Sequence, residues 1–443
     1  MGAIVTAPPA THSEIDEAPR TGWNPLTRIV FRFSFLYFGL FCVIYPQPVT
    51  TFLGWLLEWL PEETVMGAVR PLAPVLRWVG RTVFGADVEL RFNGSGDQGI
   101  MWVLLFCLLV IAVAGTLAWS LLDRRRADYR RLAGWFLLFV RLCVAGQMIN
   151  YGFGKVIPSQ MPEPTLTTLL QPFGELAPFQ VLWNQVGVSP VYEMLLGAAE
   201  LTAGILLLIP RTALAGAMLT LISMAQVFVL NMTFGVPVKI LSGHLLLLSL
   251  VLLAPEARRL LDVLVLNRAT GPSTAPYPFH TRRSRWIAAV AQLALGLWVG
   301  SAIAHAGWGF WQEGGPDRPK PPLYGIWSVS EFTRDGQPLP PLLTDENRWR
   351  TLVVDFPGQI TYQRMDGALV TVPGTVDEAT HHLDITGGPQ PAALNVDRRS
   401  ADSAILTGEV GGHPVTIALR RVDPDTFPLR RTGFRWVQDV PLE

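Results

Sequence analysis

The chain has 443 residues, of which 50% are hydrophobic and only 16% are charged, and its mean hydropathy is +0.32. Soluble domains carry about 25% charged residues, so this composition indicates a membrane protein with room for one soluble module. The formal net charge is +0, which provides no general basic field for a nucleic-acid partner. The three cysteines lie inside apolar runs without a CxxC pair, so we expect no thiol redox chemistry by this chain alone.

The first 27 residues lack a basic start followed by an apolar core, so we expect a cytoplasmic tail and not a cleavable signal peptide. A membrane span needs about 20 mostly apolar residues, and its backbone must satisfy its own hydrogen bonds, so spans are predicted as helices. Seven runs meet this requirement, at 28–46, 100–121, 132–153, 191–209, 211–231, 238–254 and 285–306. The expected fold class is an α-helical membrane protein of about seven transmembrane helices with a central four-helix bundle, followed by an all-β antiparallel barrel domain.

These runs divide the chain into consecutive segments. They are the tail 1–27, two additional spans with an external amphipathic loop at 28–130, the four-helix bundle at 131–256, a cytoplasmic loop at 257–284, the seventh helix at 285–306 and an external barrel at 322–443. The basic stretches DRRRADYRR and HTRRSR, together with Arg28 and Arg211, would all fall on one side. By the positive-inside rule we therefore expect a multi-pass protein of a bacterial inner membrane, with a cytoplasmic N-terminus and an extracytoplasmic C-terminal domain.

Two connections between spans are long. The loop at 47–99 alternates apolar and charged residues at helical spacing, so we expect amphipathic helices along the outer membrane interface. The connection at 155–190 is rich in proline but also in large apolar residues, and loops of such length are usually functional or disordered. We predict that it is ordered and forms a lid over a cavity mouth.

The stretch RLCVAGQMINYGFGKVIP places charged and amide side chains in the third span. Arg141 lies about 14 Å from the start of that span. Glu200 lies at a similar distance from the start of the next span, so both residues are expected near the membrane centre. An unpaired charge near the membrane centre costs at least about 2.5–3.5 kcal/mol. We therefore expect Arg141 and Glu200 to form a direct or water-bridged pair. Such a pair could bind a ligand, or it could serve only to lock the bundle.

Polar residues recur on four successive spans. They are Arg141, Gln147, Asn150, Lys155, Glu193, Glu200, Gln226, Asn231, Lys239 and His244. Their matching depths favour a polar cavity that opens outward and takes a small anionic or apolar ligand. Snorkelling to the interface would equally explain Lys155, Lys239 and Glu193, and His244 fits a satisfied core histidine better than a ligand-binding one. No metal site is expected, because no second histidine lies nearby in the sequence.

The stretches RLCVAGQMINYGFGK and AAELTAGILLLIPRT resemble the DoxX family of small bacterial four-helix membrane proteins, across residues 131–256. That family includes DoxD-like subunits of thiosulfate:quinone oxidoreductase. The resemblance implies a membrane module of a quinone-linked or sulfur-linked pathway in which Arg141, Lys155 and Glu200 matter most. A quinone would be bound without covalent attachment, and a redox partner protein would supply the electron chemistry.

This chain departs from the DoxX pattern by its additional spans and outer domain, and it lacks a redox cysteine pair. Whether it is an enzyme therefore stays open. One alternative is a transport or lipid-handling protein that passes an apolar ligand between the bundle and the barrel. The other is a structural assembly scaffold.

From Leu323 onward the sequence changes to short alternating runs separated by turn signals, which predicts eight to ten strands in an antiparallel barrel or sandwich. The opening GIW, with Gly325 and Trp327, resembles the start of lipocalin-like barrels. In that fold a basic residue near the last strand covers the tryptophan, and here Arg431 or Arg435 would fill the place, with Trp327 and Arg435 as the expected structural pair. The sequence leaves open whether the barrel is hollow or filled by side chains.

Overall fold

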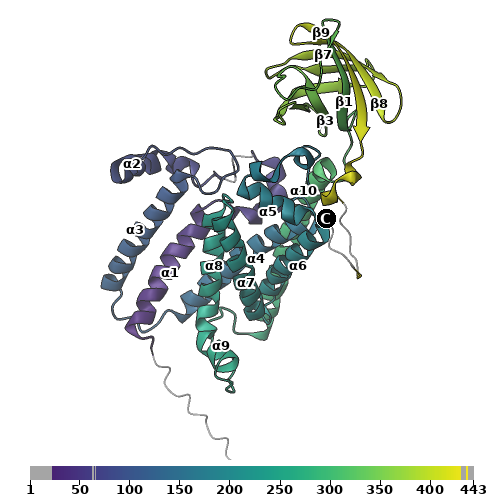
Figure 1. Ribbon diagram of the computed structural model, residues 1–443. Helices are drawn as coiled ribbons and strands as arrows, with labels where there is room; N and C mark the ends of the chain where they lie inside the picture. The colour runs from purple at the N-terminus through teal and green to yellow at the C-terminus, as the bar shows by residue number, and fades with distance from the viewer. Residues whose placement is uncertain (1–21, 62–63, 65, 431–435, 438–443) are drawn as a thin grey trace, which may run out of the picture.

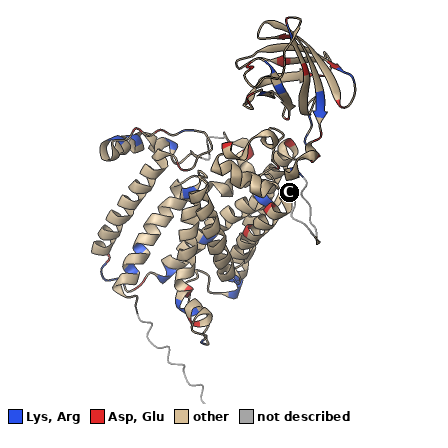
Figure 2. Ribbon diagram, viewed as in Figure 1, with Lys and Arg blue, Asp and Glu red and all other residues tan. Residues whose placement is uncertain are grey.

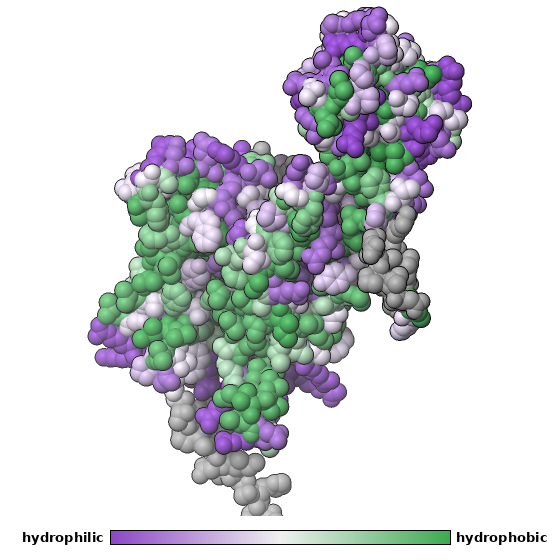
Figure 3. All heavy atoms as spheres, viewed as in Figure 1, coloured by the Kyte–Doolittle hydropathy of each residue, from purple (hydrophilic) through white to green (hydrophobic). Residues whose placement is uncertain are grey.

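The computed structural model describes residues 22–61, 64, 66–430 and 436–437. Within this part of the chain, seven helices are long and apolar enough to cross a membrane. They are α1 (Pro25–Ile44), α3 (Gly99–Leu122), α4 (Arg130–Val156), α6 (Pro190–Leu208), α7 (Ala213–Thr233), the run Lys239–Leu264 that begins with α8 (Lys239–Leu253), and α10 (Arg282–Gly314). Each predicted span therefore corresponds to a long apolar helix, and the face drawn in Figure 3 is largely apolar across these helices, with hydrophilic residues concentrated toward the top and bottom.

Basic residues occur at both ends of the helical part, including Arg77 and Arg81 near one end, but most of them lie at the other end. Lysines and arginines gather at the start of α1, the α3–α4 turn, the α6–α7 turn and the start of α10 (Figure 2). We call this the basic end, and α9 (Ala257–Leu264) also lies there (Figure 1). The opposite end carries α2 (Ala73–Phe84), α5 (Pro178–Gly187) and the C-terminal barrel, and we call it the barrel end.

The loop between α1 and α3 differs in part from the expected surface helices. Its 3-10 segment η1 (Thr50–Trp59) packs against α4 and α10. Gln147 of α4 donates to the Gln47 carbonyl oxygen at 3.0 Å and to Thr51 Oγ1 at 2.7 Å. Trp298 Nε1 of α10 donates to the carbonyl oxygen of Phe52 at 3.2 Å. One side of η1 therefore packs on α4 and α10 through polar contacts, while Leu56 and Trp59 stay exposed. Whether η1 lies along the membrane interface stays a prediction.

A glycine makes this close contact possible. Gly54 has a φ of 52°, and a Cβ atom there would lie 2.4 Å from Trp298 Nε1. The other part of the loop forms an α-helix with exposed apolar side chains. Helix α2 leaves Trp78 and Phe84 exposed, as expected for a helix lying in the membrane interface, and it lies across the end of α3 in Figure 1. The short segment η3 (Arg70–Leu72) precedes α2, and η6 (Ala254–Glu256) joins α8 to α9 at the basic end.

Helices α4 and α6 pack closely against each other, because glycines at their contact have no side chain to keep them apart. A Cβ at Gly152 would lie 2.6 Å from the backbone nitrogen of Leu201, and one at Gly197 would lie 2.6 Å from that of Val156. Small residues let membrane helices approach closely, because lipid offers no hydrophobic force between helices. These contacts also fix the register: residue 200 lies beside the last turns of α4, and Gly204 lies beside Ala145.

The C-terminal domain is a closed antiparallel barrel, which confirms the predicted class. Its strands are β1 (Gly325–Arg334), β2 (Gln337–Pro338), β3 (Trp349–Val354), β4 (Gln359–Arg364), β5 (Leu369–Asp377), β6 (His382–Ile385), β7 (Ala392–Arg398), β8 (Ser403–Val410) and β9 (His413–Val422). Each strand pairs with the next in space, and β1 pairs with β9 to close the sheet, while the short β2 pairs only with β1. An irregularity between Val329 and Glu331 bends β1 where it meets β9.

The barrel interior is filled by side chains. Trp327, Trp349 and Tyr362 are fully buried, and the rings of Trp349 and Tyr362 stack with centroids 5.1 Å apart. Trp327 Nε1 donates to the Leu323 carbonyl oxygen at 2.8 Å. The expected partner Arg435, like Arg431, lies outside the described residues. In the β1–β9 register the residue opposite Trp327 is Arg421.

The α4–α6 connection joins the helical part to the barrel. It contains η4 (Thr168–Leu170), η5 (Phe173–Glu175) and α5. Leu166 is 3% exposed and packs against Ile326 and Val353 of the barrel. Its backbone nitrogen donates to Asp355 Oδ2 at 2.8 Å. The connection predicted as a lid is therefore ordered, and part of it docks on the barrel.

Charged groups support this docking. Arg430, at the end of η8 (Pro428–Arg430) and shortly after η7 (Pro424–Thr426), reaches Glu163 Oε2 at 2.9 Å. Arg318 forms an ion pair with Asp355. Burial raises the pKa of the Asp355 carboxyl, whereas the Leu166 N–H and the Arg318 guanidinium act in the opposite direction. The carboxylate thus receives a backbone donor from the connection and a cation from the segment after α10.

Candidate functional site

The ten polar residues expected in one cavity are mostly buried and are distributed along the helical part. The buried ones are Arg141, Gln147, Lys155, Glu193, Glu200, Asn231 and His244. Asn150 and Lys239 are half-buried, and Gln226 is exposed. The structure brings Lys155, Glu193 and Glu200 together at the barrel end, whereas Arg141 lies toward the basic end.

The expected pair of Arg141 with Glu200 is wrong. Glu200 Oε2 lies 2.6 Å from Lys155 Nζ, and both side chains are buried. Arg141 instead donates from Nη2 to Gln292 Oε1 of α10. The reason is the register of α4 and α6, which is fixed by contacts at their glycines. Gly152 of α4 meets Leu201 of α6, and Arg141 lies eleven residues earlier in α4, or about 16 Å away along the helix.

Two other expected cavity residues have local structural partners. Lys239 is the first residue of α8, and its Nζ lies 3.5 Å from Asp97 Oδ2. Asp97 also accepts from the backbone nitrogens of Lys239 at 2.8 Å and Ile240 at 2.9 Å, which places a carboxylate at the positive end of the helix dipole. Asn231 Nδ2 donates to Ser242 Oγ at 3.0 Å.

His244 has the environment of a satisfied core histidine. Its Nδ1 lies 2.7 Å from the Ile240 carbonyl oxygen, and its Nε2 lies 3.0 Å from the Tyr37 hydroxyl. The ring stacks on Phe41 with centroids 3.9 Å apart. His244 therefore joins α8 to α1. Among the described residues, no group of three or more His, Cys, Asp and Glu side chains could hold a metal ion.

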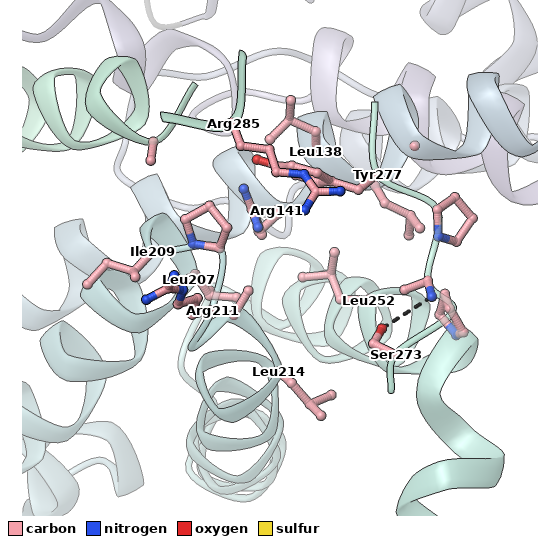
Figure 4. Close-up of a pocket in the computed structure, with 18 of the residues that line it drawn as sticks. Leu138, Arg141, Leu207, Ile209, Arg211, Leu214, Leu252, Ser273, Tyr277 and Arg285 are labelled. Atoms are coloured by element: carbon pink, nitrogen blue, oxygen red, sulfur yellow. Dashed lines mark hydrogen bonds between the residues drawn. The ribbon is translucent and has the colours of Figure 1, made fainter. Parts of the chain in front are cut away.

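A partly open pocket of about 1650 Å³ lies at the basic end (Figure 4). Its walls come from the first half of α4, the α6–α7 turn, the end of α8 and the start of α10. The segment at 273–280 forms another side. The pocket includes Arg141 but lies at the opposite end from Glu193 and Lys239, where the outward-opening cavity was expected.

Positive charge dominates this pocket, which we call the arginine pocket. Its arginines are Arg141, Arg211, Arg259, Arg282, Arg283 and Arg285, and its one carboxylate is that of Glu256. Glu256 already accepts hydrogen bonds from Arg259, at 3.2 Å, and from Ser273. The remaining guanidinium groups therefore leave an excess of positive charge that favours an anionic ligand.

Arg141 is the deepest of these arginines in the fold. It is only 8% exposed, and its buried Nε has no hydrogen-bond partner. The guanidinium lies 5.9 Å from the centre of the Tyr277 ring. Figure 4 shows Arg141 and Arg285 close together at one side of the pocket, with Arg211 apart from them beside Leu207 and Ile209. Like charges repel at such sites, so an anion between them would stabilise the arrangement.

The inner walls of the arginine pocket are apolar. They consist of the side chains of Leu138, Leu207, Ile209, Leu214 and Leu252. A small hydrated anion would gain nothing from these side chains, whereas a hydrocarbon chain would gain about 25 cal/mol for each Å² removed from water. The combination fits a ligand with an anionic head and an apolar tail.

In the sequence, most of these arginines indicate only the orientation of the spans across the membrane. Their convergence depends on turns far apart in the chain, so no local spacing reveals it. A second missed group is Arg32 of α1, which is buried and donates to the Tyr129 hydroxyl from Nη2 at 2.6 Å and to Ser120 Oγ at 2.9 Å. A charged residue inside a predicted span was the available signal.

The fold and this pocket define a multi-pass helical membrane protein with an appended antiparallel β-barrel and a basic, partly apolar pocket. YwoB of Bacillus subtilis strain 168 is 34% identical to the chain over 132 residues, which cover 28% of this chain and 78% of that protein. The chain belongs to the same family as YwoB. That protein is named as uncharacterized, so the family assigns no activity. No protein-family model and no solved structure matches this chain.

Proposed function

We propose that this protein is a lipid-handling membrane protein that binds the anionic headgroup of an amphipathic molecule in the arginine pocket. The basic end faces the cytoplasm in this proposal, since short loops rich in arginine stay on that side. The ligand then enters from the cytoplasmic leaflet, with its headgroup among the arginines and its tail along the leucine wall. In this proposal the barrel lies outside the membrane and does not take the ligand, and the burial of Trp327, Trp349 and Tyr362 inside it supports this.

One observation carries the proposal: Arg141 is buried in the pocket wall with an unpartnered Nε, among further arginines and beside an apolar surface. Guanidinium groups bind phosphate and carboxylate through paired hydrogen bonds, which suits a lipid phosphate. A pocket built only to anchor the bundle would be expected to satisfy each buried donor.

Binding of phosphatidylglycerol to the detergent-purified full chain provides the test. We expect tighter binding of phosphatidylglycerol than of phosphatidylcholine with the same acyl chains, measured by native mass spectrometry. Inorganic phosphate should bind more weakly than the anionic lipid, because it cannot use the apolar wall. The variant Arg141→Gln should weaken phosphatidylglycerol binding by about 10- to 100-fold, since a hydrogen bond to a charged group contributes about 1.5–3 kcal/mol.

Two further variants make the test specific. Arg211→Gln, at an exposed position on the pocket wall, should also weaken binding and does not depend on replacing a buried side chain. Arg81→Gln is the matched control, because Arg81 is exposed on α2 and pairs with Asp87 at 2.8 Å. Equal affinity for both lipids, or equal losses in Arg81→Gln and Arg211→Gln, would contradict the proposal.

A quinone-linked role, with a redox partner protein, is the second candidate. In its favour, Lys155 and Glu200 form a buried ion pair. The resemblance to the DoxX family singles out both of these positions. If a quinone headgroup binds beside this pair, Glu200→Gln should abolish quinone reduction in membranes containing the partner. Unchanged quinone reduction in a folded Glu200→Gln protein would remove this candidate and leave the lipid-handling proposal intact.

A further inference from the structure

The barrel end of the bundle holds two buried carboxyl groups and one buried amine. Glu193 is 0% exposed, Glu200 is 3% exposed and Lys155 is 4% exposed. Lys155 Nζ lies 2.6 Å from Glu200 Oε2, and the amine also acts electrostatically on Glu193. If all three groups are ionised, the site carries a net charge of −1 away from water.

Neighbouring elements supply no second positive charge. Helices α5 and α7, which pack against α6, contain no Asp, Glu, Lys, Arg or His. The arginines of α10 lie at the basic end, and its His305 faces Glu58 at 4.0 Å. On the other side of the site Tyr151 interacts with Glu200 and Asp97, and Asp97 is paired with Lys239.

The two carboxyl groups have unequal partners. Glu200 has the amine of Lys155. Glu193 Oε1 accepts from the Met161 backbone nitrogen at 2.9 Å, but its buried Oε2 has no hydrogen-bond partner. A buried carboxylate oxygen without a donor is costly, and the usual resolution is that the group takes up a proton and becomes neutral.

We propose that Lys155, Glu193 and Glu200 form a binding site for one exchangeable proton, which Glu193 carries. The proton neutralises the trio, with the ammonium of Lys155 paired to the carboxylate of Glu200. Glu193 also contacts Met161, which begins the segment that leads through Leu166 to the barrel. Loss of the proton would therefore place an unneutralised charge where the α4–α6 connection leaves the bundle.

Infrared spectroscopy of the purified full chain tests this proposal, because a protonated carboxyl has a C=O stretch separate from that of a carboxylate. At neutral pH we expect one such band in the wild type that disappears as the pH rises. Glu193→Gln should lack the band. Glu163→Gln should keep it, since Glu163 is partly exposed and paired with Arg430 at 2.9 Å.

A second variant tests the same assignment in case Glu193→Gln does not fold. Glu193→Met removes the charge with an apolar side chain of similar length, and it should also lack the band. A band that persists in a folded Glu193 variant would overturn the assignment, as would a wild-type spectrum without any protonated carboxyl at neutral pH. Neither result depends on lipid binding at the opposite end of the protein.

Discussion

Replacement of Lys155 by methionine is expected to destabilise the protein by about 3–5 kcal/mol, because removal of one partner leaves an uncompensated buried charge. Glu200 would lose the amine that lies 2.6 Å from its Oε2, at a position that is only 3% exposed. The fall in thermal midpoint can be followed by intrinsic tryptophan fluorescence in detergent. Part of the loss should return as the pH is lowered, since the unpaired carboxylate of Glu200 then takes up a proton.

A double variant separates the charge effect from the loss of packing. Lys155→Met combined with Glu200→Met replaces the ion pair by apolar side chains, which is often neutral or stabilising when the volume is similar. We therefore expect the double variant to be more stable than Lys155→Met alone. A double variant that is no more stable than the single one would show that packing, and not the unpaired carboxylate, dominates.

Gly197→Ala is expected to cost about 3 kcal/mol, the upper end of the usual range for overpacking. The new Cβ would lie 2.6 Å from the Val156 nitrogen and 2.7 Å from the Gly152 oxygen. Both are backbone atoms, so no side-chain rotation relieves the clash, and α4 and α6 must separate. The thermal midpoint of the purified variant measures the loss.

Gly39→Ala provides the matched control. Gly39 also lies within a membrane helix, α1, but a Cβ there would meet nothing within 4 Å. Alanine favours helix over glycine by roughly 0.5–1 kcal/mol, so this variant should be unchanged or slightly more stable. Similar behaviour of the two alanine variants would argue against close α4–α6 contact.

The class of fold could be predicted because its signals are local. Each span is a continuous apolar run, so α3 and α7 are evident from hydropathy alone, and the alternation in β8 and β9 predicts strands directly. The filled barrel was beyond prediction, because the choice depends on how Trp327, Trp349 and Tyr362 meet across strands far apart in the sequence.

The polar contacts between helices could not be predicted, because they depend on register and on which spans are neighbours. Counting residues from the start of each helix predicted that Arg141 would lie opposite Glu200. In the structure Gly152 contacts Leu201, so Glu200 lies beside Lys155 instead. The actual partner of Arg141 is Gln292, which lies on the last span, 151 residues later in the chain. The arginine pocket likewise combines five separate parts of the chain: the first half of α4, the α6–α7 turn, the end of α8, the segment 273–280 and the start of α10.

A cryo-electron microscopy map of the full chain in nanodiscs tests the central claim most directly. With phosphatidylglycerol in the bilayer, the lipid-handling proposal predicts a headgroup within hydrogen-bonding reach of Arg141 Nε and a tail along Leu207 and Leu252. With phosphatidylcholine alone, the headgroup position beside Arg141 should be empty. An empty arginine pocket in both bilayers, or the same lipid density in both, would contradict the claim that the pocket selects an anionic amphiphile.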